Sequence, residues 1–129
     1  MLDTSICVEA IRRRDLGLVS RLGRLDPGSG CLSAVSLAEL EFGASKSSNS
    51  LKNRVALLKF CSGLEILPFD KGAAADYGSL RAELEGRGQG IGPLDTLIAA
   101  HALSLSAVLV TRNVKEFRRI PNLVVESWS

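Results

Sequence analysis

Hydrophobic and polar residues alternate along the chain in two patterns, one typical of amphipathic helices and one of buried strands. Apolar residues recur at helical spacing in five segments, which we predict as helices: 5–24, 36–47, 49–63, 71–86 and 93–104. Four short apolar runs between or after these segments predict buried strands: 31–35, 64–69, 107–111 and 122–127. The stretch "DPGSG" at 26–30 predicts a turn.

Short apolar strands that alternate with helices indicate an α/β fold, in which a parallel sheet has helices on both faces. The 129 residues suit a single domain, 1–129. In such sheets, functional side chains gather at the carboxyl ends of the strands. We therefore expect a site among the polar residues that follow the predicted strands, namely Asp3, Ser36 to Glu39, Asp70 and Thr111 to Asn113.

Composition narrows the class of protein without fixing its partner. Hydrophobic residues make up 46% and charged residues 23%, which is a globular rather than a disordered mixture. The net charge of +2 neither demands nor excludes a nucleic-acid partner. Three widely spaced cysteines, Cys7, Cys31 and Cys61, and one histidine argue against a zinc site and for free thiols in a reducing cytosol.

The most apolar segment, 94–111, is interrupted by Asp95 and His101, so a membrane span is not expected. The first residues, "MLDTSICVEAIRRR", carry their positive charges after the apolar residues, unlike a secretory signal. We therefore expect a cytoplasmic location and no membrane partner.

Four acidic residues in distant parts of the chain stand at element boundaries beside apolar residues: Asp3, Glu39, Asp95 and Glu116, the last close to Asn113. A wound sheet would bring them to one edge. Carboxylates that share a site repel one another and keep their charge only beside a cation. Mg²⁺ or Mn²⁺ suits such oxygen ligands. Two such ions, about 3.5–4 Å apart, can promote phosphodiester cleavage.

Each acidic residue also has a simpler structural role. Asp3 is a plausible cap for the helix that follows, and Ser36-x-x-Glu39 is a capping box. Asp95 fits the first turn of a helix, where the dipole favours an anion by about 0.3–1 kcal/mol. Asn113 and Glu116 fit the surface of a loop. Spacing alone does not decide between these roles and a metal site.

Three further features favour ordinary structural roles. His101 and Asp95 point about 240° apart around a helix, so they do not share a ligand, and a hydrogen-bonded or surface histidine is expected. The glycine-rich "GRGQGIG" follows a helix and lacks Gly-Lys-Ser/Thr, so we interpret it as a mobile loop. The basic groups at 12–14 and 112–119 are typical of solvated faces, although beside a metal site they could contact RNA phosphates.

Several motifs together resemble a known family. "LDTSI", "SAVSLAELEFG", "IGPLDTLIAAHAL" and "LVTRNVKEF" follow one another as the motifs of PIN-domain ribonucleases do, in particular the toxins of VapBC-type toxin–antitoxin pairs. The ending "RIPNLVVESW" is also similar. The resemblance spans almost the whole chain, and four motifs in order are more specific than any single one.

The resemblance implies a three-layer PIN-like fold and a Mg²⁺- or Mn²⁺-dependent endoribonuclease that cleaves tRNA or other structured RNA. It implies that Asp3, Glu39 and Asp95 bind the metal ion. Many members have a fourth acid where this chain has Asn113, so Glu116 is the nearest acid that can take its place. Only Met1 and Leu2 precede Asp3, so the first strand is expected to be short.

The resemblance also implies a cognate antitoxin that covers the pocket, and a homodimer. Thr111 would orient a ligand or a water molecule beside the site. Arg112 and Lys115 are candidates for contacts with the RNA backbone.

Two functions of other classes stay open at this point. Asp70 directly follows a predicted strand, and Thr111 follows a later one, as in phosphoacceptor signalling domains. That class also requires an adjacent acidic pair after its first strand, whereas Asp3 stands alone. The other alternative is a non-catalytic binding module that keeps the PIN-like fold but has lost the fourth acid.

Overall fold

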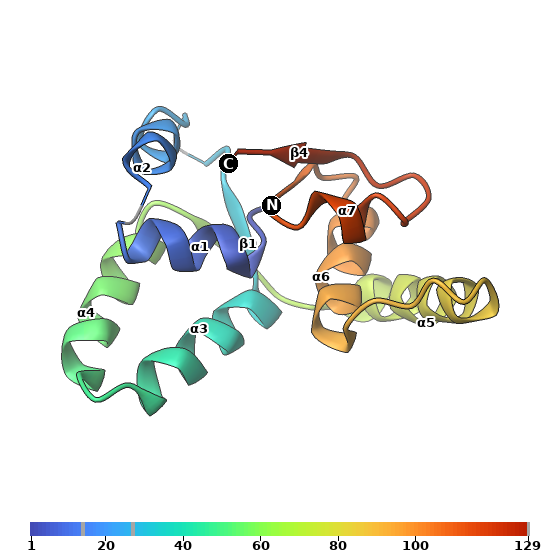
Figure 1. The fold of residues 1–129 in the computed structure, drawn as a ribbon, viewed down its shortest axis with the longest axis horizontal. Helices are drawn as coiled ribbons and strands as arrows, with labels where there is room; N and C mark the ends of the chain where they lie inside the picture. Colours follow the sequence, from blue (N-terminus) through green and yellow to red (C-terminus); the bar gives the residue numbers. More distant parts are fainter. Residues whose placement is uncertain (14, 27, 129) are drawn as a thin grey trace.

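A computed structural model describes residues 1–13, 15–26 and 28–128. Within these residues the chain forms helices and short strands in mixed order, as Figure 1 shows. The elements are α1 (Thr4–Ile11), α2 (Leu16–Gly23), β1 (Cys31–Ser33), α3 (Ala34–Lys46), α4 (Ser50–Cys61), β2 (Glu65–Leu67), α5 (Lys71–Gly86), α6 (Pro93–Ser104), β3 (Leu109–Thr111), α7 (Val114–Phe117) and β4 (Val125–Ser127).

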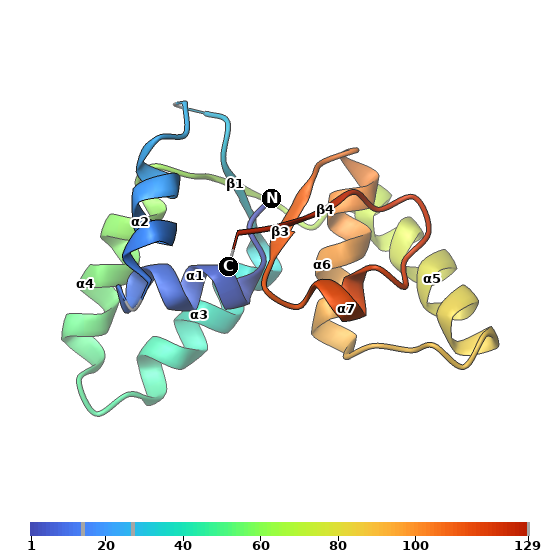
Figure 2. The ribbon, with the colours of Figure 1, turned by 45° about the horizontal axis from the view of Figure 1, so that its top comes forward.

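Two parallel strand pairs, β1–β2 and β3–β4, are joined by residues 1–3. The Leu2 amide donates to the Cys31 carbonyl (3.0 Å), and the Asp3 amide donates to the Val110 carbonyl (2.8 Å). Leu2 also forms a parallel bridge with Val110. The first residues therefore run between β1 and β3, in the middle of the molecule (Figure 2). Asp3 lies at the carboxyl edge of this arrangement, beside Thr111.

The strands separate two hydrophobic cores. Because side chains alternate across a strand, Met1 packs with the core formed by α5, α6 and α7, whereas Leu2 packs with the core formed by α1 to α4. Leu109 and Val110 divide between the two cores in the same way. Figures 1 and 2 show these two groups of helices on opposite sides of the strands. The predicted three-layer α/β arrangement is therefore confirmed.

Four of the five predicted helices are confirmed within two residues at either end: α3, α4, α5 and α6. The single helix predicted over 5–24 is wrong, because the chain forms α1 and α2 with a break between them. Arg13 has a left-handed backbone (φ 52°), and the Asp15 side chain caps α2 by accepting from the Leu18 amide (3.0 Å). Arg14, which the prediction included, lies outside the described residues.

The predicted turn at 26–30 is confirmed where it is described. The Ser29 amide donates to the Asp26 carbonyl (3.0 Å), and Pro27 lies outside the described residues. The strands are shorter than predicted, three residues each. β1 and β2 end early because a helix or a loop follows them, whereas β3 and β4 begin two or three residues later than predicted and end where predicted. No helix among the described residues has both the length and the apolar character needed to span a membrane.

The capping box predicted at Ser36 and Glu39 is wrong. Helix α3 begins at Ala34, and its cap is Ser33, three residues before Ser36; the Ser33 side chain accepts the Val35 amide (3.1 Å). Ser36 lies inside the helix with 0% of its surface exposed. Its Oγ has no hydrogen-bond partner among the described residues. This frees the Glu39 carboxylate from a capping role.

Ser36→Ala is therefore expected to leave the free energy of unfolding unchanged or to raise it by up to about 1 kcal/mol. The change removes a buried hydroxyl without a partner and introduces a better helix former. Ser33→Ala is the matched control, and it should lose about 0.5–2 kcal/mol because it removes a helix cap. Urea denaturation measures both. A larger loss at Ser36 than at Ser33 would contradict the observed start of the helix.

Candidate active site

Asp3 is buried at the edge where the first residues meet β3, with only 1% of its surface exposed. Its Oδ2 accepts hydrogen bonds from the hydroxyls of Ser5 (2.8 Å) and Thr111 (2.7 Å). The Thr111 hydroxyl in turn accepts the Asn113 amide (2.9 Å). Although Asp3 stands at the start of α1, its side chain caps no amide there, so the capping role is excluded. Its other oxygen, Oδ1, accepts no hydrogen bond from a described residue.

Glu39 lies on α3 and reaches the same edge from another layer. Its Oε1 accepts a hydrogen bond from the Thr4 hydroxyl (2.8 Å), and Thr4 directly follows Asp3. The Glu39 side chain is half-buried. Thr4 and Ser5 therefore each orient one acid, a role that the sequence analysis missed. The signal was the pair of hydroxyl residues in "LDTSI", directly after the predicted metal ligand.

Asp95 lies in the first turn of α6, two residues after Pro93, and is half-buried. Its pKa is raised to about 6, first by burial and then by the negative charges of Asp3, Glu116 and Glu39. A hydrogen bond with the Glu116 carboxyl raises it further. The structure therefore brings the three predicted acids and Glu116 into one electrostatically coupled cluster. The helix dipole also acts on Asp95, because this residue lies in the first turn of α6.

Asn113 and Glu116 differ in how they meet this cluster. Helix α7, which the sequence analysis treated as a loop, is anchored by the fully buried Phe117. It turns the half-buried Glu116 toward Asp95. Asn113 is exposed at the start of α7, and its side chain caps no amide. Glu116 is therefore the fourth acid of the cluster, whereas Asn113 contributes its backbone amide to Thr111.

The donor set of the cluster is four carboxylates. Among the described residues, no group of three His, Cys, Asp or Glu is already close enough to hold a metal ion directly. Oxygen donors without imidazole or thiolate suit Mg²⁺ or Mn²⁺ better than Zn²⁺, whose protein sites usually include imidazole or thiolate. Mg²⁺ keeps several of its waters and needs only one or two direct carboxylates. The residues present therefore fit a hydrated hard cation.

A family model of the PIN domain matches residues 1–123. The chain belongs to the PIN domain family. This agrees with the three-layer arrangement and with the acids at the carboxyl edge of the strands.

Two relatives of this PIN domain match along nearly the whole length of both proteins. Ribonuclease VapC2 of Rickettsia felis is 46% identical over 129 residues, covering 99% of this chain and 96% of the relative. The tRNA(fMet)-specific endonuclease VapC of Shigella flexneri is 40% identical over 129 residues, covering 100% and 97%.

Solved structures show the same backbone. VapBC2 from Rickettsia felis, bound to a DNA fragment from their promoter, matches with a TM-score of 0.94 and 45% identity, covering 100% of this chain and 98% of the other. DNA-bound VapBC from Salmonella typhimurium matches with a TM-score of 0.95 and 40% identity, covering 100% and 97%.

Asp70, the residue of the phosphoacceptor alternative, is exposed in this PIN domain and caps α5 by accepting the Ala73 amide (3.0 Å). His101 is buried and bonded to Ser33, so the expectation of a hydrogen-bonded histidine is confirmed. The three cysteines are free thiols, as expected. Burial is the main cause that raises the pKa of Cys7.

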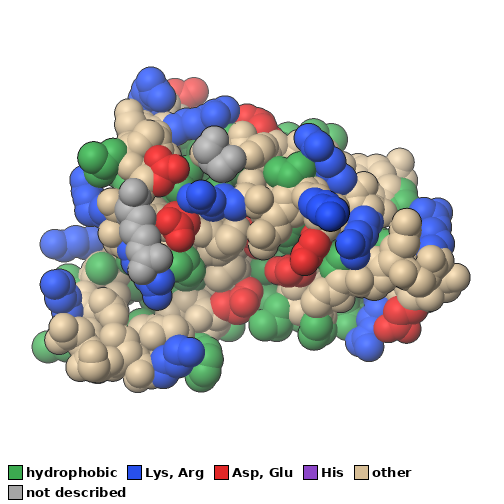
Figure 3. Space-filling model, in the orientation of Figure 1, with side chains coloured by type: hydrophobic (Ala, Val, Ile, Leu, Met, Phe, Trp, Pro, Cys, Tyr) green, Lys and Arg blue, Asp and Glu red, His purple; other side chains and the backbone are tan. Residues whose placement is uncertain are grey.

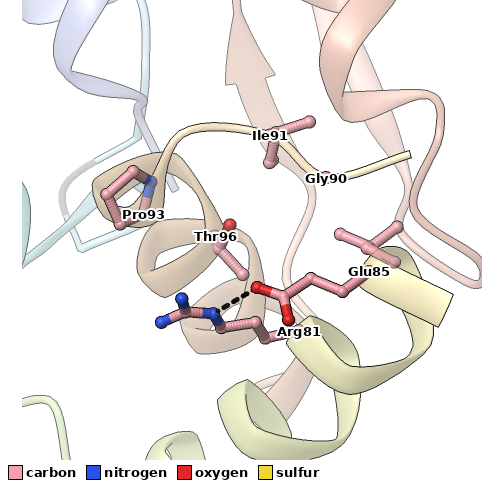
Figure 4. A pocket seen from close by; sticks show the side chains of 7 residues that line it. Arg81, Glu85, Gly90, Ile91, Pro93 and Thr96 are labelled. Carbon is pink, nitrogen blue, oxygen red and sulfur yellow. Dashed lines mark hydrogen bonds and ion pairs between the residues drawn. The ribbon is translucent and has the colours of Figure 1, made fainter. Parts of the chain in front are cut away.

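Two cavities lie near α6 and α3. The first, of about 110 Å³, lies between α5 and the loop that leads to α6, and Arg81 on its wall is already paired with Glu85 (2.9 Å; Figure 4). It offers no free positive charge for a phosphate. The second, of about 160 Å³, opens between α1, α3 and α4. Glu39 lies on its wall, and Leu40 and Leu57 line it, so this groove leads toward the acids.

Figure 3 shows Lys and Arg side chains over α7, with acidic side chains beside them. Arg112 lies 3.7 Å from Glu9 and 3.9 Å from Asp15, so these acids partly neutralise it. Lys115 and Arg118 are exposed, and neither forms an ion pair with a described residue. The surface next to Glu116 is therefore positively charged.

Proposed function

We propose that this PIN domain is a metal-dependent endoribonuclease that cleaves tRNA or another structured RNA, and that a cognate antitoxin inhibits it. The observation that carries the proposal is the cluster of Asp3, Glu39, Asp95 and Glu116, gathered from four elements. The names of the relatives, ribonuclease and tRNA(fMet)-specific endonuclease, support RNA as the substrate.

Asp3, Glu39 and Asp95 are the residues that would hold Mg²⁺ or Mn²⁺. Such an ion, when bound, supplies positive charge that acidifies a water molecule and stabilises charge on the phosphoryl oxygens. Ser5 and Thr111 fix the Asp3 carboxylate through Oδ2 and leave Oδ1 free to face the site. Thr4 fixes Glu39 through one oxygen in the same manner. Glu116 would accept a proton from a nearby water and orient it.

The experiment that tests this function is incubation of the purified chain with total tRNA and with an unstructured RNA in Mg²⁺ buffer. Mapping of the cut sites should show discrete cleavage in the structured RNA. Complete protection of both RNAs would contradict the nuclease assignment and favour a non-catalytic binding module.

The antitoxin is the proposed protein partner, because both solved relatives described above are VapBC complexes. The apolar groove beside Glu39 supports this, since a polypeptide seated there would cover an acid of the site. The exposed Leu51 and Leu58 of α4 (77% and 71%) add apolar surface of the kind that partners bury. A homodimer also stays part of the proposal.

The two candidates for the fourth site residue are expected to behave differently. Glu116→Gln should lower kcat for RNA cleavage by about 10²–10⁴-fold, the usual size of a general acid–base contribution. Asn113→Ala should change kcat less than threefold, because only the Asn113 backbone amide reaches Thr111. Steady-state cleavage measures both. A larger loss of kcat in Asn113→Ala than in Glu116→Gln would show that Asn113, and not Glu116, is the fourth residue of the site.

Lys115 and Arg112 are proposed to contact RNA phosphates beside Glu116. Lys115→Gln should reduce the steepness with which log K, the association constant for RNA, falls with log salt concentration. The slope should become shallower by about 0.7–0.9, the value for one released counterion. Arg112→Gln should have a smaller effect, because Glu9 and Asp15 already offset its charge. Lys52→Gln, on α4, is the control and should leave the slope unchanged. Equal effects at positions 115 and 52 would contradict this RNA path.

A further inference from the structure

His101 is a buried titratable residue that the proposed chemistry does not use. It lies on α6, six residues beyond Asp95, and only 1% of its surface is exposed. Its Nδ1 lies 2.8 Å from Oγ of Ser33. The ring also makes a hydrogen bond with the Pro68 carbonyl and an edge contact with the Phe69 ring, whose centroid is 5.4 Å away.

These partners fix the tautomer of the ring. The Pro68 carbonyl can only accept, so the ring nitrogen that faces it carries the proton. Since Nδ1 faces Ser33, that nitrogen is Nε2. The Ser33 Oγ already accepts the Val35 amide (3.1 Å), so its own O–H is free to donate to Nδ1. The neutral ring thus satisfies both of its nitrogens in the protein interior.

This single ring connects the two helices that carry Asp95 and Glu39. Ser33 is the last residue of β1 and the cap of α3, and Glu39 follows it by six residues on that rigid helix. Asp95 lies at the start of α6, the helix of His101. Helices α3 and α6 also pack against each other. A change in the His101–Ser33 bond would therefore shift one acid relative to the other.

We propose that His101 is a positioning residue, which sets the separation of the Glu39 and Asp95 carboxylates through Ser33. This inference rests on the proposed function, because it concerns how those acids share a cation. It assigns His101 no contact with the RNA or with the cation.

The test is calorimetric titration of the full chain with Mn²⁺. His101→Leu removes both hydrogen bonds and should weaken Mn²⁺ binding by tenfold or more, as for other outer residues that orient ligands. His101→Asn places an amide oxygen near the position of Nδ1, so it can still accept the Ser33 hydroxyl. It should restore Mn²⁺ affinity to within about threefold of the unmodified chain.

A control separates positioning from loss of stability. Leu18→Ala leaves a cavity under α2, a helix without any of the four acids, and should cost about 2–5 kcal/mol of stability. It should change Mn²⁺ affinity less than twofold. Equal losses of Mn²⁺ affinity in His101→Leu and Leu18→Ala would overturn the proposal. It would also be overturned if His101→Asn bound Mn²⁺ no more tightly than His101→Leu.

A double-mutant cycle tests the route through Ser33. Ser33→Ala and His101→Leu should each weaken Mn²⁺ binding, and the double variant should be no weaker than the weaker single variant. Additive losses would show that the two residues act separately and would overturn the proposal. If the unmodified chain binds no Mn²⁺, the proposed function fails and this inference fails with it. If it binds Mn²⁺ and His101→Leu binds equally well, only this inference fails.

Discussion

Asp95→Asn is expected to reduce RNA cleavage about a thousandfold and, in EDTA, to make the protein more stable. Asp95 is one of three proposed cation ligands, and loss of a few kcal/mol of stabilisation of the transition state accounts for a factor of this size. Asparagine has nearly the same shape and keeps a partner for Glu116, so the fold should persist. Steady-state cleavage in Mg²⁺ and thermal unfolding in EDTA measure the two effects.

The gain in stability should depend on pH. Because the folded-state pKa of Asp95 is raised from 3.8 to about 6, folding favours its protonated form. That contribution to stability is fully present below about pH 4 and is lost as the pH rises through about 6. At pH 7.5 the charged carboxylate therefore destabilises the metal-free protein. After allowance for solvent screening of a half-buried group, Asp95→Asn should gain about 1–2 kcal/mol at pH 7.5, and this gain should vanish near pH 4.

Asp70→Asn is the matched control. Asparagine caps a helix about as well as aspartate, so the stability of the protein should be unchanged. Asp70 lies outside the acid cluster, so the rate of RNA cleavage should also be unchanged. Full RNA cleavage by Asp95→Asn with metal present would overturn the assignment of the active site. Loss of function in Asp70→Asn would revive the phosphoacceptor alternative.

Removal of divalent cations is the second large effect that we expect. EDTA should lower the rate of RNA cleavage to below a thousandth of the rate in Mg²⁺. The four carboxylates alone offer no positive charge to the phosphate. Added Mg²⁺ or Mn²⁺ should restore it. The same ions should raise the unfolding temperature, since an ion at ten times its Kd stabilises the folded state by about 1.4 kcal/mol.

The control is the Asp95→Asn protein, whose unfolding temperature should respond less to Mn²⁺ than that of the unmodified chain. Cleavage that persists undiminished in EDTA would contradict the metal-dependent mechanism. Cleavage lost in EDTA but restored only by Zn²⁺ would contradict the assignment of an oxygen-only donor set.

The spacing of the apolar residues predicted the three layers of the fold, because a helix that packs against a sheet needs an apolar face. Helices α4, α5 and α6 have apolar residues at helical spacing between clear ends, and they appear where expected. The break between α1 and α2 was missed because the apolar positions continue in helical phase across it. Its signal was local, since Asp15 stands three residues before the amide that it caps.

The sequence named the candidate acids of the site, but not the residues that orient their side chains. Asp3 and Asp95 stand at element boundaries, whereas Glu39 lies inside α3, and the choice of these three acids depended on the resemblance to PIN-domain ribonucleases. Ser36 was expected from the sequence as the cap of the third helix, whereas Ser33, the last residue of β1, caps α3 in the structure. Glu116 could not be distinguished from Asn113 because α7 is too short to show a period, and the buried Phe117 determines its orientation.

The placement of residues 1–3 between β1 and β3 has a consequence for when the protein becomes active during its synthesis. Asp3 leaves the ribosome early, yet its backbone partner Val110 and its acidic neighbour Glu116 are made more than a hundred residues later. Contacts this distant along the chain form late in folding. A ribosome-bound chain that ends before β3 would therefore hold Asp3 without the neighbours it needs, so a nascent chain should not cut RNA before β3 and α7 have been synthesised.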